Sequence, residues 1–381
     1  MSTSSLREIV EEWGGLIQTG PFGSQLHQND YSKQGIPVVM PKNIRNGRVD
    51  ESGIARIPEG KASNLSRHFL KAGSVIFPRR GEISKCAYIN EEQAGFLCGT
   101  GCIKIEPPEE RLRSKFLFYF LGLRQSVEWL ERNAVGTTML NLNTKILGGL
   151  KIPLFAPKKQ DEIVENLSAY DDLIENNRRR IQLLEESARL LYKEWFVHLR
   201  FPGHEHIRIV DGVPEGWERK RLGEITFLNY GKALKESDRE PGPFPVYGSS
   251  GVVGSHVKAL IPGPVIIVGR KGNVGSVFWS SEDCHPIDTV FYIDKNNSSF
   301  LLYHALQHMA FISTDVAVPG LNRVFAQSHL LLLPEQRIFN LFEEIVTVIQ
   351  MQIDTLSKEI VFLSQARDLL LPRLMNGEVV I

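Results

Sequence analysis

The sequence predicts an α+β protein in which two similar globular domains are joined by two long antiparallel helices, with a pseudo-two-fold internal repeat. Two observations lead to this fold class. Apolar residues recur at alternating steps of three and four in two long runs, and the second run lies 179 positions after the first. Each run follows a segment rich in glycine and β-branched residues. The order of domain then helix is therefore present twice in 381 residues.

The first long helix is predicted from Asp161 to about Arg200, and the second ends at Asn376-Gly377, a plausible helix stop. About 40 residues at 1.5 Å each make a rod of roughly 60 Å, which requires a partner for its apolar seam. Steps of three and four are typical of a coiled coil. We expect the two helices to pair through Leu167, Tyr170, Ile174, Ile181, Leu184 and Leu191 on one side, and Val346, Ile349, Ile353, Leu356, Ile360, Leu363 and Leu370 on the other.

Two features of these helices predict how they pair. Asn177 and Arg367 are polar members of the seam, and such residues commonly set register. A globular segment of about 130 residues separates the helices, a usual domain size that lets the chain return. Antiparallel pairing is therefore the compact solution.

Matched segments support the repeat within the globular parts, because diverged copies keep their elements and vary in their loops. Leu6-Arg7-Glu8-Ile9 matches Leu222-Gly223-Glu224-Ile225, and Val75–Gly81 matches Ile266–Gly272. Further matches are Ile36-Pro37-Val38 with Phe244-Pro245-Val246, Thr19-Gly20 with Tyr230-Gly231, Leu140-Asn141 with Leu321-Asn322, and Pro153 with Pro334. We predict a first globular domain at 1–157, a helix at 158–200, a second domain at 201–334 and a helix at 335–381.

Composition limits the class of protein. Lys+Arg and Asp+Glu are equal at 44 each, which argues against a simple polycation but not against local basic patches. The four cysteines lack a CxxC pair, so we expect free thiols. No apolar run reaches membrane-spanning length and the first 30 residues lack a signal-peptide pattern, so we expect a cytoplasmic protein without a membrane partner.

The residues predict a binding protein and no catalytic site. Glu106-Pro107-Pro108-Glu109 has the wrong ends for an amino-methyltransferase motif, and Gly263–Lys271 fails the Walker A spacing. His304 and His308 are four residues apart but lack the glutamate of a zinc protease, so we predict no metal site. We therefore expect no cofactor in this chain.

Two basic turns are the strongest candidates for contact with nucleic acid. Arg79-Arg80 with Lys85, and Arg270-Lys271 with Asn273, follow matching β-branched runs in the two copies. Arginine and lysine bind phosphates, arginine can also bind guanine, and asparagine can bind adenine. A solvated hairpin tip is the alternative for either turn alone. Recurrence at the same place in both copies favours DNA.

Two further sets of candidates follow the matched segments. The second set is Lys42, Asn43 and Arg45 in the first copy, and Tyr247, Ser249 and Ser250 in the second. The third set is Thr137, Thr138 and Asn141 with Asn322 and Arg323, where the neighbouring glycines can simply form turns.

Several motifs resemble a known family. Gly212-Val213-Pro214-Glu215-Gly216-Trp217-Glu218 looks like the entry to the second target-recognition domain in specificity subunits of type I restriction–modification systems. Thr19–Ser24 and Gly136–Asn141 resemble markers of the first such domain. Glu194-Trp195-Phe196 and Leu369–Glu378 resemble the two conserved helices of that family. The first copy departs from the pattern because it lacks the Pro-Glu-Gly-Trp entry.

This resemblance implies a non-catalytic subunit whose two domains each read one half of an interrupted, asymmetric double-stranded DNA site. It also implies that the helices set the spacing and dock two methyltransferase (modification) subunits, a core that restriction (endonuclease/translocase) subunits join. S-adenosylmethionine, ATP and magnesium would belong to those partners. The resemblance leaves open a specificity subunit of a related methylation-based phage-defence system. A coiled-coil scaffold without sequence-specific DNA readout is a further alternative, and an enzyme with an unrecognised site is another.

Overall fold

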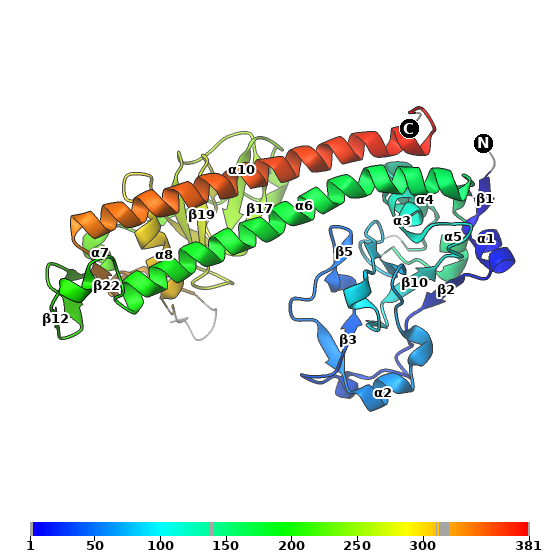
Figure 1. Cartoon of the computed structure of the whole chain (residues 1–381), viewed down its shortest axis with the longest axis horizontal. Helices are drawn as coiled ribbons and strands as arrows, with labels where there is room; N and C mark the ends of the chain where they lie inside the picture. The colour runs from blue at the N-terminus through cyan, green and yellow to red at the C-terminus, as the bar shows by residue number, and fades with distance from the viewer. Residues whose placement is uncertain (1–2, 137–139, 310, 312–319, 380–381) are drawn as a thin grey trace. The chain divides into compact units, whose positions relative to one another are not determined.

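The computed structural model describes residues 3–136, 140–309, 311 and 320–379 (Figure 1). The chain divides into two compact units. Unit 1 comprises residues 1–174 and 362–381, and unit 2 comprises residues 175–361. Both division points fall inside the two long helices, so each helix contributes residues to both units.

Unit 1 is built on a four-stranded antiparallel sheet of order β2-β10-β7-β8 and a three-stranded sheet of order β6-β3-β9, in which β3 and β9 are parallel. Its strands are β1 (Thr3–Ser5), β2 (Leu16–Thr19), β3 (Ile36–Val39), β4 (Ile44–Arg45), β5 (Arg48–Val49), β6 (Ala55–Ile57), β7 (Val75–Pro78), β8 (Ala87–Tyr88), β9 (Leu97–Cys98), β10 (Cys102–Glu106) and β11 (Lys151–Pro153). Its helices are α1 (Leu6–Trp13), α2 (Glu59–Ser63), α3 (Ser114–Gly122), α4 (Arg124–Asn133) and α5 (Thr144–Gly148).

Unit 2 repeats this plan with a four-stranded sheet of order β15-β21-β18-β19 and a three-stranded sheet of order β17-β16-β20, in which β16 and β20 are parallel. Its strands are β12 (Ile209–Val210), β13 (Val213–Pro214), β14 (Glu218–Arg221), β15 (Asn229–Tyr230), β16 (Phe244–Gly248), β17 (Gly251–His256), β18 (Val265–Gly269), β19 (Val277–Ser280), β20 (His285–Pro286), β21 (Val290–Ile293) and β22 (Leu330–Leu333). Its shorter helices are α7 (Leu222–Ile225), α8 (Phe300–His308) and α9 (Arg323–Gln327).

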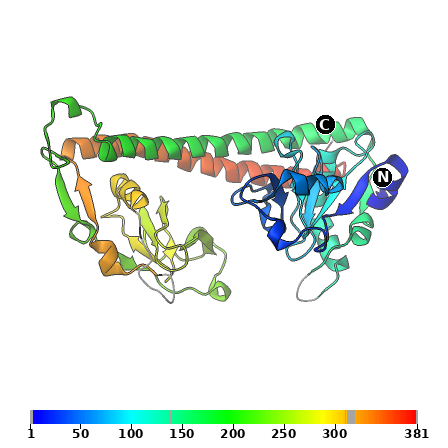
Figure 2. The ribbon, with the colours of Figure 1, turned by 90° about the horizontal axis from the view of Figure 1, so that it is seen from below.

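The predicted repeat is confirmed at the start of each copy. The N–H of Leu6 donates to the carbonyl of Leu150, and the N–H of Leu222 donates to the carbonyl of His329, both at 2.8 Å. Glu8 and its counterpart Glu224 each accept a 2.8 Å hydrogen bond from the backbone N–H three residues earlier. These glutamates satisfy a donor that the first helical turn leaves free. The neighbouring strand pairs, β1 with β11 and β14 with β22, are also equivalent. Figure 2 shows β14 (green) beside β22 (orange).

One part of the predicted repeat is wrong. Leu321-Asn322 is equivalent to Leu142-Asn143 and not to Leu140-Asn141, because Asn143 and Asn322 each cap the short helix that follows. The segment Leu140-Asn141-Leu142-Asn143 contains the same dipeptide twice, so sequence alone could not choose between the two alignments. A second match is also shifted. Pro153 lies opposite the first residue of β1, and Leu332 occupies the equivalent position opposite β14. The counterpart of Pro153 is therefore Leu332 and not Pro334.

The first long helix, α6, runs over Pro157–Tyr192 and continues as a π-helical turn over Lys193–Val197. It begins four residues before Asp161 and one residue before the predicted domain boundary at 158. The second, α10, runs over Gln336–Met375, and Gly377 follows with a φ of 70° that favours glycine. The predicted stop at Asn376-Gly377 is therefore confirmed.

Contacts inside each unit show that α6 and α10 pair antiparallel. In unit 1 the start of α6 packs on the end of α10, with Leu167 in the same core cluster as Leu371 and Leu374. In unit 2 the end of α6 packs on the start of α10, with Ala188 beside Phe342. None of the predicted pairing residues is exposed. Leu167, Ile174, Val346 and Leu356 are buried, and the others are partly buried.

Both polar seam residues have partners within their own unit. Asn177 is 5% exposed and donates to a carboxylate oxygen of Glu359 at 2.9 Å. Arg367 donates to Asp171 at 2.6 Å. Because a buried polar pair is satisfied only in one alignment, both contacts favour this register.

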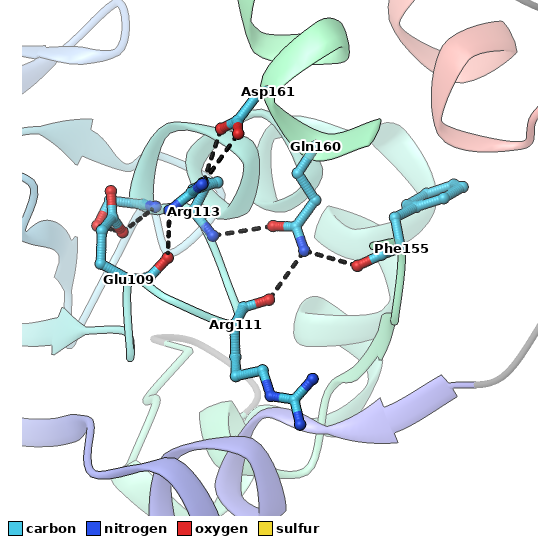
Figure 3. Close-up of polar contacts among 7 residues, drawn as sticks. Glu109, Arg111, Arg113, Phe155, Gln160 and Asp161 are labelled. Atoms are coloured by element: carbon cyan, nitrogen blue, oxygen red, sulfur yellow. Dashed lines mark hydrogen bonds and ion pairs between the residues drawn. The ribbon is translucent and has the colours of Figure 1, made fainter. Parts of the chain in front are cut away.

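The start of α6 is fastened to the globular part of unit 1 by Gln160 (Figure 3). Its side chain is 1% exposed and accepts a 2.8 Å hydrogen bond from the N–H of Arg113. It also donates at 2.9 Å to the carbonyls of Arg111 and Phe155. The next residue, Asp161, accepts two hydrogen bonds from the Arg113 guanidinium at 2.7 and 2.9 Å. One turn of helix therefore fixes the loop that leads into α3.

Candidate nucleic-acid interface

The two basic turns occupy the same place in the two four-stranded sheets. Arg79 follows β7 and Arg270 follows β18, each an inner strand of its sheet. The carbonyl of Arg79 accepts a hydrogen bond from the N–H of Leu142, and that of Arg270 accepts one from Leu321, both at 2.8 Å. Equivalent backbone bonds hold the two turns, so the repeat places their cations alike.

In unit 1 the two arginines of the first turn differ in exposure. Arg80 is exposed, whereas Arg79 is half-buried and its Nε is enclosed without a hydrogen-bond partner. Lys85 forms an ion pair with Glu82, which partly neutralises it. Arg80 forms a β-bridge with Asn141, whose side-chain oxygen is also enclosed and lacks a hydrogen bond.

The first-ranked and third-ranked candidates of the first copy therefore lie together. Thr137 and Thr138 belong to the third-ranked group but fall outside the described residues. They stay predictions.

The second set of candidates in unit 1 loses one of its three members in the structure. Lys42 and Arg45 are exposed, and Arg45 lies 3.5 Å from Asp50 in an ion pair. Asn43 is 2% exposed; its amide donates to the carbonyl of Asp50 at 3.0 Å and accepts from the N–H of Met40 at 3.1 Å. Both ends of that amide are used inside the domain. The structure therefore removes Asn43 from the side chains that could contact DNA.

In unit 2 the second basic turn lies beside the tip of the β16–β17 hairpin. Lys271 and Asn273 are exposed. The Ser276 hydroxyl donates to the carbonyl of Ser249 at 2.6 Å and lies 2.9 Å from the carbonyl of Asn273, so it joins turn and hairpin. Ser250 at the same tip is exposed. Two candidate segments from different parts of the sequence thus form one surface.

Tyr247 does not belong to that surface. It is 9% exposed and packs in a core cluster with Val265, Ile267 and Cys284. Burial raises the pKa of its hydroxyl. The prediction that Tyr247 contacts DNA is therefore wrong, because its strand turns the ring into the domain.

Asn322 and Arg323 have different roles. The side-chain oxygen of Asn322 accepts from the N–H groups of Val324 and Phe325 at 2.8 and 3.2 Å and caps α9. This cap engages the oxygen and neither donor of the NH₂ group. The guanidinium of Arg323 lies over an aromatic ring of β15.

That ring belongs to a cluster which the sequence reasoning missed. The carbon of the Arg323 guanidinium is 4.6 Å from the ring centre of Phe227 and 4.9 Å from that of Tyr230. The Arg270 guanidinium is also 4.9 Å from Tyr230. Phe227 and Tyr230 are nonetheless 52% and 48% exposed. The only hint of this cluster in the sequence was that Tyr230 precedes Gly231, and that pair was noted for its glycine and not for its aromatic ring.

Other chemistry is limited in the part of the chain that the structure describes. All four cysteines are free, as predicted, and the structure buries each of them. Burial raises the pKa of Cys86 and of Cys98 to about 12. Among the described residues, there is no group of three His, Cys, Asp or Glu side chains placed to hold a metal ion. No helix formed by those residues has the length and apolarity needed to cross a membrane.

The long helices also carry exposed apolar side chains away from their seam. Leu183 and Leu190 on α6 are 62% and 48% exposed, and Val348 and Met351 on α10 are 53% and 64% exposed. In unit 1, Phe362 and Leu369 of α10 are seven residues apart and are 67% and 74% exposed. An apolar stripe of this kind favours contact with another protein.

Comparison with known proteins gives a consistent result. The family described as "Type I restriction modification DNA specificity domain" matches residues 15–186 and 214–324. A type I restriction enzyme MjaIX specificity subunit from Methanocaldococcus jannaschii is 24% identical, covering 98% of this chain and 92% of that protein. The HindI specificity subunit from Haemophilus influenzae is 23% identical, covering 81% and 87%.

A solved structure resembles the fold as well. The crystal structure of a type I restriction–modification S subunit from M. genitalium superposes with a TM-score of 0.55 at 19% identity, covering 98% of this chain and 95% of that one. At this identity the likeness concerns the fold.

Proposed function

The chain belongs to the type I restriction–modification DNA specificity family, and from this premise we propose that its globular domains, residues 1–157 and 201–334, each read one half of an interrupted, asymmetric double-stranded DNA site. The chain is a DNA specificity subunit, a class that is non-catalytic in type I systems. Methylation and cleavage are then tasks of other subunits, which would hold S-adenosylmethionine, ATP and magnesium.

The observation that carries this proposal is the repeated basic turn. Arg79-Arg80 and Arg270-Lys271 follow equivalent strands and are held by equivalent backbone hydrogen bonds. Charge that recurs at one place in both copies suits a ligand with a repeating anion, and duplex DNA is such a ligand. A formal net charge of zero fits a protein that gains much of its affinity from these local patches and from its partners.

Base reading would come from exposed polar groups around those turns. Each well-placed bidentate pair discriminates by about 1–3 kcal/mol, so a few contacts in each domain are enough for a short half-site. The remaining candidates in unit 1 are Lys42, Arg45, Arg79, Arg80, Lys85, Asn141 and the two threonines outside the described residues. Those in unit 2 are Ser249, Ser250, Arg270, Lys271, Asn273, Asn322 and Arg323.

The long helices would set the distance between half-sites and dock two methyltransferase subunits, to which restriction subunits bind. Support for the spacing role is the length of α6 and α10, 36 and 40 residues, and the fact that each contributes to both units. Support for docking comes from exposed apolar side chains of α10 in each unit, such as Met351 in unit 2 and Phe362 in unit 1.

Methylation mapping in cells that express the chain with its methyltransferase partners tests the proposal. The expected result is a methylated motif with two short halves and a fixed gap, one half of which changes when residues 207–333 are replaced by those of a relative. Partner binding without any sequence preference would instead support a scaffold. An insertion of seven residues in both α6 and α10 should alter the gap or abolish methylation of the original motif; an unchanged gap and activity would refute the spacing role.

A further inference from the structure

The two copies of the domain provide an internal comparison of the DNA-facing surface. Thr19 pairs with Ile103, which pairs with Phe77, two residues before Arg79. Tyr230 pairs with Phe291, which pairs with Val268, two residues before Arg270. Thr19 and Tyr230 are therefore equivalent positions, as are Arg79 and Arg270.

The same comparison separates shared from copy-specific side chains. An arginine stands first in the basic turn of both copies. In contrast, the Arg323 cluster is present in the second copy only: Leu16, Thr19 and Thr144 stand where the second copy has Phe227, Tyr230 and Arg323. The last equivalence holds because Thr144 and Arg323 each follow the asparagine that caps α5 or α9.

Phosphates and bases place different demands on a duplicated domain. The DNA backbone is the same at both half-sites, so phosphate contacts suit residues that both copies share. The bases of an asymmetric site differ, so base contacts must differ between copies. Arg270 stands at a position where both copies have arginine, as suits a phosphate contact. Arg323 is present in the second copy only, as suits a base contact.

The geometry around Arg323 suits a base reader. Phe227 and Tyr230 hold its guanidinium through their ring faces, a contact that uses none of its N–H donors. Among the residues that the structure describes, the Arg323 side chain has no partner for a hydrogen bond or an ion pair. With respect to those residues, its planar set of donors is therefore oriented and unengaged. Arg270 differs because its Nη1 donates to the carbonyl of Asp288 at 3.0 Å.

We propose that Arg323, oriented by Phe227 and Tyr230, reads a guanine in the half-site of the second domain, while Arg79 and Arg270 bind phosphates. This inference rests on the proposed function. Guanine is the base whose O6 and N7 accept both donors of an arginine fork in the major groove. Arg323 is thus a specificity-determining residue, and the two aromatic rings are positioning residues.

The test uses the full chain in complex with its methyltransferase subunits. The variant Arg323→Thr introduces the residue that the first copy has at the same position, so the local fold tolerates it. Arg323→Lys keeps the charge but loses the fork, and Arg208→Thr removes an exposed arginine elsewhere in unit 2 as a charge-matched control. Binding to the mapped site is measured against duplexes with every base substituted in turn, at several salt concentrations.

We expect both Arg323 variants to lose preference for guanine at one position of the second half-site, by about 5- to 150-fold, with other positions unchanged. Arg270→Ala should weaken all duplexes alike and lower the slope of log affinity against log salt by about 1. Arg208→Thr should behave as wild type.

Unchanged preference at every position in Arg323→Thr would overturn the inference. So would a uniform loss with a lower salt slope in Arg323→Thr but not in Arg323→Lys, because that pattern marks a phosphate contact. Either result leaves the proposed function standing, since the wild-type complex still reads its site. A wild-type complex without any sequence preference would instead refute the proposed function itself.

Discussion

Arg367 on α10 donates a 2.6 Å hydrogen bond to Asp171 on α6, and the hydroxyl of Tyr119 on α3 donates to the other oxygen of the same carboxylate at 2.5 Å. One side chain therefore joins both long helices to a helix of the globular part of unit 1. Burial, reinforced by the hydrogen bond to Asp171, raises the pKa of Tyr119 far above its ordinary value, so the hydroxyl remains a donor.

We expect Asp171→Ala to lower the free energy of unfolding by about 2–3 kcal/mol, because it leaves a partly buried guanidinium and a buried hydroxyl without their acceptor. Asp368→Ala is the matched control. Asp368 also accepts hydrogen bonds from Arg367, at 2.8 and 3.0 Å, but its side chain is 61% exposed. Its removal should cost less than about 1 kcal/mol. Equal losses in urea unfolding of the two variants would contradict this ranking.

Gln160 gives a second comparison between neighbours. Gln160→Leu fills a similar volume but deprives three backbone groups of their partner, so we expect a loss of about 3 kcal/mol. Asp161→Ala removes the adjacent ion pair with Arg113, whose members are 53% and 32% exposed, and should cost less than about 1 kcal/mol. Chemical unfolding of the full chain measures both. A larger effect from Asp161→Ala would show that the ion pair, and not the amide, fastens α6.

Features with a local signature were predictable from the sequence. The seam of α6 and α10 follows from apolar spacing alone, and the start of each copy follows from a leucine and a glutamate that occupy the first turn of α1 and α7. The basic turns were also visible, since two cations follow a β-branched run in both copies. Periodicity and short motifs report such features because neighbouring residues make the contacts.

Features that depend on distant residues were not predictable. Tyr230 and Arg323 are 93 positions apart, and only the sheet brings them together. The burial of Asn43 depends on the carbonyl of Asp50 across a hairpin. The two copies also use different side chains to hold the globular part against the long helices. Gln160 holds the loop before α3, whereas Glu343 on α10 accepts from the first N–H groups of α8 at 3.0 and 2.7 Å.

Acid should destabilise unit 2 through His304. This ring is 5% exposed among aromatic side chains, and burial lowers its pKa from 6.5 to about 4. A group with a lowered folded pKa contributes stability above its unfolded pKa, and the contribution is lost as pH falls from 6.5 towards 4. At pH 5 the loss is about 2 kcal/mol.

The variant His304→Phe keeps an aromatic ring but cannot titrate. Between pH 7 and pH 5, the fall in its free energy of unfolding should be smaller than that of wild type by about 2 kcal/mol. Urea unfolding at both pH values measures this difference. Parallel pH dependence in the two proteins would show that His304 is hydrated and titrates normally.

Two equivalent glycines give the last prediction. Gly20 and Gly231 each follow the outer strand of the four-stranded sheet, and a Cβ at either position would overlap a backbone carbonyl, that of Gly99 or that of Ile287. Each carbonyl is held by a hydrogen bond, that of Gly99 from the N–H of Cys102 and that of Ile287 from the N–H of Val290. We therefore expect Gly20→Ala and Gly231→Ala each to cost about 1–3 kcal/mol. Gly23→Ala is the control, because a Cβ there meets nothing within 4 Å and the backbone is not left-handed. It should be neutral or stabilise by up to about 1 kcal/mol. Thermal unfolding of the three variants compares them, and a neutral Gly231→Ala would mean that the second copy has room which the first lacks.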